Sequence, residues 1–99
     1  LVIRGEGVER NPEIGVKWLR FAAEHGHPVA QNRLARIYAT GLGAQADAVE
    51  AATWNLLAEK GGRPDATLEE LMKNLSTEQR AEAQKRVDGF VAKPAPQLD

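Results

Sequence analysis

The sequence predicts an all-α fold built from repeated helical units, and two observations carry this prediction. The first is an internal repeat: Trp18 and Trp54, the only two tryptophans, lie 36 positions apart, and the same step relates Pro28 to Pro64. Self-similarity at a period of roughly 20–50 residues is typical of solenoid proteins. The second is that apolar residues recur at helical spacing between glycines, and no segment predicts a strand. The other identities in this register are Gly5 with Gly41, Gly7 with Gly43, Ala22 with Ala58, Gly26 with Gly62 and Ala30 with Ala66.

The composition limits the chain to one domain and excludes several classes of site. The chain has 99 residues, a formal net charge of −1 and no cysteine. It therefore lacks the basic field that attracts nucleic acid, and it cannot form disulfides, thiolate nucleophiles or zinc–thiolate sites. No apolar run approaches the roughly 18 residues of a membrane span, so we expect no membrane insertion. No signal peptide is recognisable at Leu1, and because the chain opens without Met and in mid-pattern, we expect a longer parent protein.

The first complete helix is expected to begin at Asn11-Pro12-Glu13. Residues 1–4 before it resemble the last turn of an earlier helix, which Gly5 and Gly7 would end. Asn caps free backbone N–H groups, Pro suits the first turn, and an acidic residue suits the positive end of the helix dipole. Apolar residues follow at helical spacing, and Gly26 is expected to end the helix in a left-handed conformation. These residues are Ile14, Trp18, Phe21, Ala22 and His25.

Two further helices are expected between Pro28 and Gly62. The second helix starts near Pro28 and ends at Gly41, with an apolar face of Ala30, Leu34, Ala35, Ile37 and Tyr38. The third helix starts at Asp47, and Glu50, three residues later, predicts a capping box. It carries Ala51, Trp54, Leu57 and Ala58 and ends at Gly61-Gly62.

Beyond Pro64 the repeat decays into a shorter pattern. A helix is expected from Asp65 to Leu75, although Thr67 with Glu70 offers an alternative start. Ser76 with Gln79 is a further capping box, so a final helix begins at Thr77 and ends near Gly89. This last helix is highly charged, and such a polar helix can cover the last apolar face of a repeat array. Its thin apolar stripe is Ala83, Val87 and Phe90, and Glu82 and Arg86 are spaced for an ion pair.

A known family is similar to most of this chain. Residues 30–44, AQNRLARIYATGLGA, resemble the first helix and loop of the Sel-one-like repeat, whose pattern is A-x-x-x-L-G-x-x-Y-x-x-G-x-G-V. Asn11-Pro12, Trp18 and the segment FAAEHGH are similar to the second helix of that repeat. The similarity extends from Gly5 to Ala66. The departures are Gly15, Ala35 and Ala44, where the family pattern has Ala, Gly and Val.

This resemblance implies a right-handed α-solenoid of antiparallel helix pairs, related to tetratricopeptide repeats, that acts as an adaptor between proteins. We expect one domain over residues 1–92, divided into a partial repeat (1–26), a repeat (27–62) and a degenerate repeat with its cap (63–92). Residues 93–99 are expected to be a disordered tail. Bacterial proteins that resemble this one often act outside the cytoplasm, which favours a periplasmic over a cytoplasmic location only slightly and leaves the compartment open.

The partner-binding surface is expected on the concave side, which the first helix of each pair lines in such solenoids. Asn32 and Arg36 share one helix face, with Arg33 and Thr40 nearby. In the related tetratricopeptide proteins, amide and basic side chains clamp a peptide carboxylate, and Arg is a good bidentate partner for such a group. One repeat later the same positions hold Leu68 and Met72. We therefore expect a polar patch beside an apolar patch, suited to an amphipathic peptide or a partner helix. The alternative is an ordinary solvated helix face.

Other functions have weaker support in the sequence. His25 and His27 flank Gly26, but there is no third histidine, so no metal or other cofactor is expected. The chain has no cysteine and no G-x-S-x-G motif, and Ser76, its only serine, is explained as a helix cap, so no catalytic residue is expected. A repeat-based hydrolase or ligand-binding protein is therefore the least favoured alternative. The other alternative is a purely structural role, as the C-terminal cap of a longer repeat protein.

The two tryptophans are expected to anchor the core of their repeats. The N-terminal edge is expected to be adhesive, because Val2, Ile3, Ile14 and Val16 would lack the neighbour that a preceding helix provides. Self-association through this edge is therefore possible in addition to a protein or peptide partner.

Overall fold

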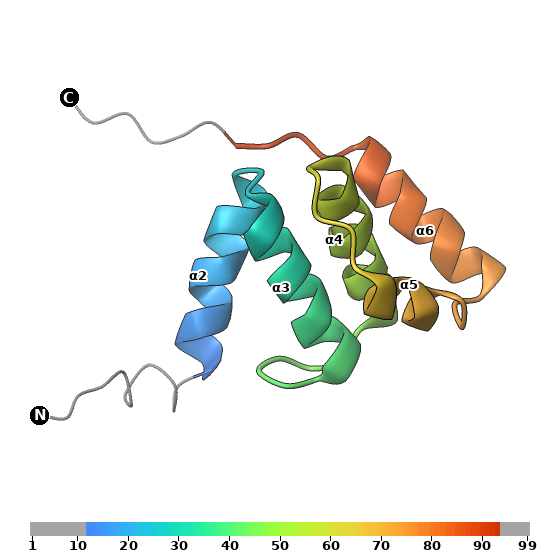
Figure 1. The fold of residues 1–99 in the computed structure, drawn as a ribbon, viewed down its shortest axis with the longest axis horizontal. Helices are drawn as coiled ribbons and strands as arrows, with labels where there is room; N and C mark the ends of the chain where they lie inside the picture. Colours follow the sequence, from blue (N-terminus) through green and yellow to red (C-terminus); the bar gives the residue numbers. More distant parts are fainter. Residues whose placement is uncertain (1–11, 94–99) are drawn as a thin grey trace, which may run out of the picture.

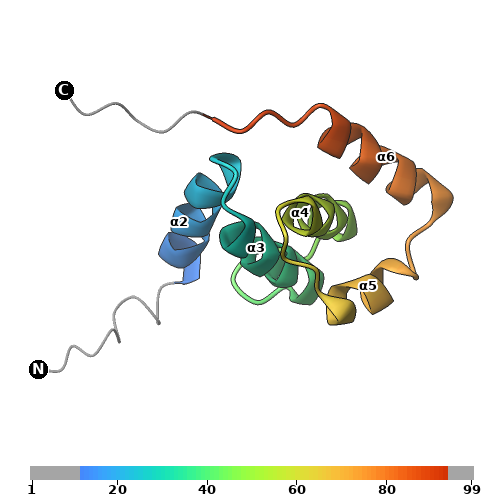
Figure 2. The same cartoon turned by 45° about the horizontal axis from the view of Figure 1, so that its top comes forward.

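The computed structural model describes residues 12–93, which form α-helices joined by short loops (Figures 1 and 2). The expected end of an earlier helix at residues 1–4, the cap at Asn11 and the tail from residue 94 lie outside the described residues. The helices within this range are α2 (Pro12–Glu24), α3 (Pro28–Thr40), α4 (Ala48–Lys60), α5 (Ala66–Met72) and α6 (Thr77–Asp88). The expected all-α fold is confirmed.

The helix boundaries follow local backbone chemistry. Gly26 and Gly41 follow α2 and α3 with φ angles of 88° and 79°, in the left-handed region that glycine tolerates best. Asp47 caps α4, because its carboxylate accepts hydrogen bonds from the backbone N–H groups of Val49 and Glu50, both at 3.1 Å. These three boundaries agree with the sequence prediction.

Glu50 does not complete the capping box that the sequence predicts. The backbone N–H of Asp47 donates instead to the carbonyl of Tyr38 at 2.9 Å, which ties the loop after α3 to the start of α4. The Glu50 carboxylate accepts from Trp54 Nε1 at 3.1 Å and from Arg86 at 3.0 Å. Glu50 therefore links α4 to α6 rather than closing its own helix end.

The region after α4 differs in one boundary. Asp65, not Thr67, caps α5, and the helix ends at Met72, three residues before the expected Leu75. The reason is the next cap: Ser76 and Gln79 form a capping box in which each side chain bonds to the other residue's backbone N–H. The chain therefore leaves α5 early, and Leu75 lies in the connection.

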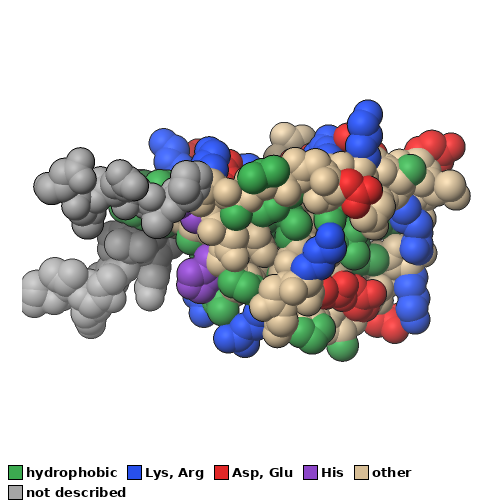
Figure 3. Space-filling model, turned by 90° about the horizontal axis from the view of Figure 1, so that it is seen from above, with side chains coloured by type: hydrophobic (Ala, Val, Ile, Leu, Met, Phe, Trp, Pro, Cys, Tyr) green, Lys and Arg blue, Asp and Glu red, His purple; other side chains and the backbone are tan. Residues whose placement is uncertain are grey.

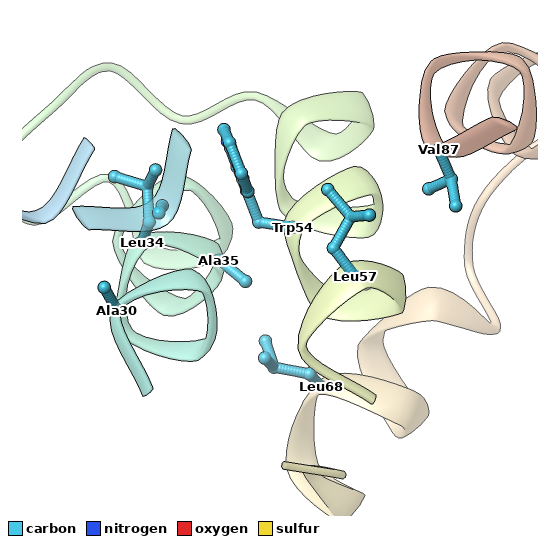
Figure 4. Packing of buried hydrophobic residues seen from close by; sticks show 8 residues of the cluster. Ala30, Leu34, Ala35, Trp54, Leu57, Leu68 and Val87 are labelled. Carbon is cyan, nitrogen blue, oxygen red and sulfur yellow. The ribbon is translucent and has the colours of Figure 1, made fainter. Parts of the chain in front are cut away.

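The core is built around α4, which packs against α3, α5 and α6 (Figures 2 and 4). Residues 51–55 are buried without interruption, so α4 is covered on all sides, as expected for a central helix. In Figure 4 the ring of Trp54 lies between α4 and α3, and Leu57 points toward Val87 of α6. The core cluster is Ala23, Ala30, Leu34, Ala35, Trp54, Leu57, Leu68 and Val87.

Within the described range, the helix α2 packs mainly against α3, and this corrects the prediction for Trp18. The side chains of Val16 and Leu19 pack against the core cluster. The expectation that Val16 lies on an open edge is therefore wrong. Trp18 is 70% exposed and Trp54 is 6% exposed, although the repeat places them at the same position. Trp18 is therefore not a core residue here, because the helices that cover Trp54 have no described equivalent over Trp18.

The segment after α6 runs back across one end of the helices toward α2 (Figure 1). Phe90 packs edge-on against the Trp54 ring, with ring centroids 5.9 Å apart. At the far end, Lys93 donates from its backbone N–H to the Glu24 carbonyl and from its side chain to the Glu24 carboxylate, both at 2.9 Å. Lys93, at the start of the expected tail, thus connects the segment after α6 to the end of α2.

Candidate functional site

The predicted polar patch lies where α3 runs beside α5. Asn32 Nδ2 donates to the Asp65 carboxylate at 2.9 Å, and Arg36 Nε donates to the same oxygen at 2.7 Å. The other carboxylate oxygen of Asp65 accepts from the first turn of α5. The resemblance assigned the donors Asn32 and Arg36 to the carboxylate of a bound peptide. In this structure both donors are already bound to Asp65 of the chain itself.

Asp65 is held in its charged form by these contacts. Burial alone would raise its pKa, and this is the largest single influence. The hydrogen bonds from Asn32, Arg36 and the backbone N–H of Leu68 outweigh it together, so the pKa of Asp65 falls from 3.8 to about 2. The Arg36 side chain remains 54% exposed while it holds Asp65. Part of its guanidinium is thus accessible to a second acidic group.

The remaining predicted residues differ in what they present to solvent. Arg33 is exposed, whereas Leu68 is only 1% exposed and belongs to the core, so it offers no surface to a partner in this structure. Thr40 donates to the carbonyl of Arg36 at 2.9 Å and accepts from the backbone N–H of Leu42, so it helps form the turn after α3. Met72 is half-buried at the end of α5.

Two shallow hollows lie next to Met72 and Leu75, and these two residues line both hollows. The first, called the α3 hollow, measures about 260 Å³ and is lined further by Tyr38, Ala39, Ala46, Asp47, Ala48, Ala51 and Leu71. The second, called the α6 hollow, measures about 190 Å³ and is lined further by Ala52, Leu56, Glu69, Arg80, Ala83 and Gln84. Most of the α3 hollow is apolar, and the residues of α3 that line it, Tyr38 and Ala39, follow Arg36 by two and three positions. The sequence prediction missed it because it depends on the early end of α5.

A pair of carboxyl groups lies near the α6 hollow. Glu69 accepts a hydrogen bond from Asn55 Nδ2 at 2.9 Å. The hydrogen bond between Glu59 and Glu69 raises the pKa of Glu59 to about 7, with burial and the negative charge of Glu69 adding to the effect. The same hydrogen bond, with that from Asn55, lowers the pKa of Glu69. The proton of this pair is therefore held mainly by Glu59, which loses it near neutral pH.

The two histidines at the α2–α3 joint make local contacts. His25 Nδ1 lies 2.7 Å from the carbonyl oxygen of Phe21, and its ring stacks on the Phe21 ring with centroids 4.3 Å apart. His27 occupies the N-cap position of α3 without a side-chain capping bond. Within residues 12–93, no three His, Asp or Glu side chains are grouped so that they could hold a metal ion.

The charge pattern of the surface is mixed. Acidic and basic side chains are interspersed on the face shown in Figure 3, with apolar groups between them. Of the helices described, none combines the length and apolar character needed to cross a membrane. This surface suits contacts with a protein or peptide better than a purely electrostatic partner.

Comparison with known proteins identifies the repeat. The family model of the Sel1 repeat matches residues 3–27 and 28–62, which together make up more than half of the chain. Neither a curated protein nor a solved structure matches the chain. The boundary between the two matched repeats falls at the joint between α2 and α3.

Proposed function

Because this chain belongs to the Sel1 repeat family, whose repeats generally mediate contacts between proteins, we propose that it is a non-catalytic adaptor that binds a peptide or partner helix along α3 and α5. The observation that carries the proposal is the α3 hollow, an apolar recess whose lining on α3 includes Ala39, three residues after the partly exposed Arg36. Of the apolar patch that the sequence predicts at Leu68 and Met72, only Met72 lines this hollow.

The chemistry of this surface defines the peptide. A Leu- or Met-sized side chain would enter the α3 hollow and contact Leu71 and Met72. An acidic residue about one helical turn away would approach the exposed part of Arg36. Arg33, exposed on the same helix, adds a second positive charge. An amphipathic acidic helix meets these requirements, with anchors at i and i+3 or i+4.

The experiment is selection of helical peptides on the immobilised chain from a displayed library, followed by affinity measurement on variants. Met72→Lys places a charge in the apolar recess, and we expect it to weaken the selected peptides by at least about tenfold. Arg36→Glu should weaken acidic peptides and spare neutral ones. The matched controls are Val91→Lys and Lys85→Glu, at exposed positions away from the hollow.

Two results would remove this assignment. If the selected peptides bound Met72→Lys and Arg36→Glu as tightly as the unaltered chain, the interaction would lie elsewhere. If no two peptides from the library competed with each other for the same surface of the chain, the proposed adaptor role of this segment would be contradicted.

A structural capping role is the second candidate, and α6 favours it. This helix buries only Ala83 and Val87 and presents a charged outer face. It covers α4 and is anchored by Arg86, which contacts Glu50 at 3.0 Å and Glu82 at 2.9 Å. Such a helix prevents further stacking at this end of the array. A capping role accounts for α6 but leaves the α3 hollow unexplained.

A further inference from the structure

The helix α2 has apolar side chains on two opposite faces. Val16, Leu19 and Ala23 lie on one face and pack against the core cluster. The opposite face, called the α2 face, consists of Ile14, Lys17, Trp18 and Phe21, which line a shallow hollow of about 300 Å³. An edge helix that ended the fold would carry polar groups on its outer side, as α6 does. The α2 face is therefore unlike a solvated surface.

Trp54, which is equivalent to Trp18 in the next repeat, shows how a tryptophan at this position is covered. Trp54 is buried between α4 and α3 and is also covered by Phe90. Trp18 is 70% exposed, and its only aromatic contacts in the described range come through Phe21, whose ring lies edge-on at 6.4 Å. Exposed tryptophan and phenylalanine side chains on one face are typical anchors of protein interfaces.

The spacing of the α2 face is self-complementary. A two-fold axis midway between two antiparallel copies of α2, level with the point between Lys17 and Trp18, pairs position 14 with 21 and position 17 with 18. Two antiparallel copies of α2 would therefore place Ile14 of one against Phe21 of the other. Each Lys17 would lie over Trp18 of the other copy, which is a favourable cation–π arrangement.

The charges around the α2 face agree with the same axis. It places Glu13 opposite Ala22 and Arg20 opposite Gly15, and the two Lys17 side chains, which flank the axis, can each turn toward the Trp18 ring of the other copy. A Cβ atom built on Gly15 has no neighbour within 4 Å, which leaves room for a long side chain from a second copy. Closed two-fold pairs of this kind bring the same patch of both subunits together.

We propose that the α2 face binds the same face of a second copy of this chain in an antiparallel, two-fold arrangement. The contact is small, because four residues on each side form its centre, so the dimer is weak and concentration-dependent. It leaves the α3 hollow open, since that surface involves α3, α4 and α5. The proposal is therefore independent of peptide binding.

The primary experiment is sedimentation equilibrium of the whole chain over a wide range of concentration. The unaltered chain should show a monomer–dimer equilibrium, and Trp18→Ser should weaken it by at least about tenfold. The matched control is Leu42→Ser, because Leu42 is 76% exposed in the loop before α4. This control and Met72→Lys should leave the dimer unchanged. A monomer at all concentrations, or a dimer insensitive to Trp18→Ser, would overturn the proposal.

Cysteine cross-linking tests the antiparallel arrangement, because the chain has no cysteine of its own. A mixture of Ile14→Cys and Phe21→Cys chains should form a disulfide between unlike copies faster than either chain does alone. Faster cross-linking between like copies would indicate parallel helices and contradict the antiparallel arrangement. Circular dichroism of each variant confirms that the helices are retained.

Discussion

The helices α2 and α4 occupy the same position in successive repeats but have different environments. α4 is enclosed by α3, α5 and α6, so even its Thr53 and Asn55 are buried. α2 contacts α3 on one side and carries exposed aromatic side chains on the other. The comparison shows that a repeat position specifies a helix and its apolar residues, whereas the neighbouring helices decide whether those residues form a core or a surface.

The largest expected difference concerns the two tryptophans. Trp54→Ala should lower the free energy of unfolding by about 3–5 kcal/mol, because it leaves a cavity between α3 and α4. Trp18→Ala should change it by no more than about 0.5 kcal/mol, because that side chain is largely exposed. Urea unfolding followed by circular dichroism, at a concentration where the chain is monomeric, measures both values. Equal losses would refute the distinction between the two helices.

The next effect concerns Asp65, which secures the start of α5 beside α3 and has no counterpart on the outer side of α2 within the described residues. Asp65→Asn keeps a capping side chain but removes the charge that Arg36 and Asn32 hold. We expect a loss of about 1–2 kcal/mol at neutral pH.

The pH dependence of Asp65 gives a control for this variant. Because its folded pKa is lowered to about 2, its contribution is complete above 3.8 and is lost as pH falls toward 2. The unaltered chain and Asp65→Asn should therefore converge in stability near pH 2. A constant difference from pH 7 to pH 2 would show that the charge is not responsible.

A smaller effect is expected from Glu59, which lies near the end of α4 and pairs with Glu69 of α5. Its pKa is raised from 4.5 to about 7, so the folded protein binds the proton more tightly than the unfolded chain does. The stabilisation is complete below 4.5 and is lost as pH rises through 7. With solvent screening, we expect the unaltered chain to lose about 1 kcal/mol between pH 5 and pH 8.

Glu59→Gln isolates this contribution, because the amide keeps the shape of the protonated acid. The variant should show a flatter stability profile than the unaltered chain between pH 5 and pH 8, measured by thermal unfolding. An identical decline in both proteins would assign the pH dependence to other groups.

The smallest effect is expected at Lys93, which joins the C-terminal segment to the end of α2. Lys93→Ala removes the ion pair with Glu24 but keeps the backbone hydrogen bond, so the loss should be below about 0.5 kcal/mol. Amide hydrogen exchange should increase at the end of α2 and not in α4. An increase throughout α4 would mean that the two helices do not open independently.

Much of the fold could be predicted from local signals in the sequence. Gly26 and Gly41 end helices because their backbone conformation favours glycine, and Asp47 and Ser76 start helices because their side chains satisfy free N–H groups. The predicted pair of Glu82 and Arg86 is present at 2.9 Å. These interactions extend over only three or four residues, so spacing alone identifies them.

The features that could not be predicted depend on contacts between distant segments. Arg36 and Asp65 are 29 positions apart, and Lys93 and Glu24 are 69 apart. No local pattern of residues predicts either of these ion pairs. The exposure of Trp18 could not be inferred from its own repeat either, because it depends on which helices cover it. The α3 hollow likewise results from the unexpected early end of α5.

The most direct test of the account uses the two tryptophans as separate reporters. Trp18→Phe leaves only Trp54, and Trp54→Phe leaves only Trp18, so acrylamide quenching of fluorescence measures the accessibility of each. In dilute solution, Trp18 should be quenched several-fold more strongly than Trp54, and its quenching should decrease as concentration rises and the α2 faces pair. Equal protection of both tryptophans in dilute solution would show that α2 is already covered and would contradict the account.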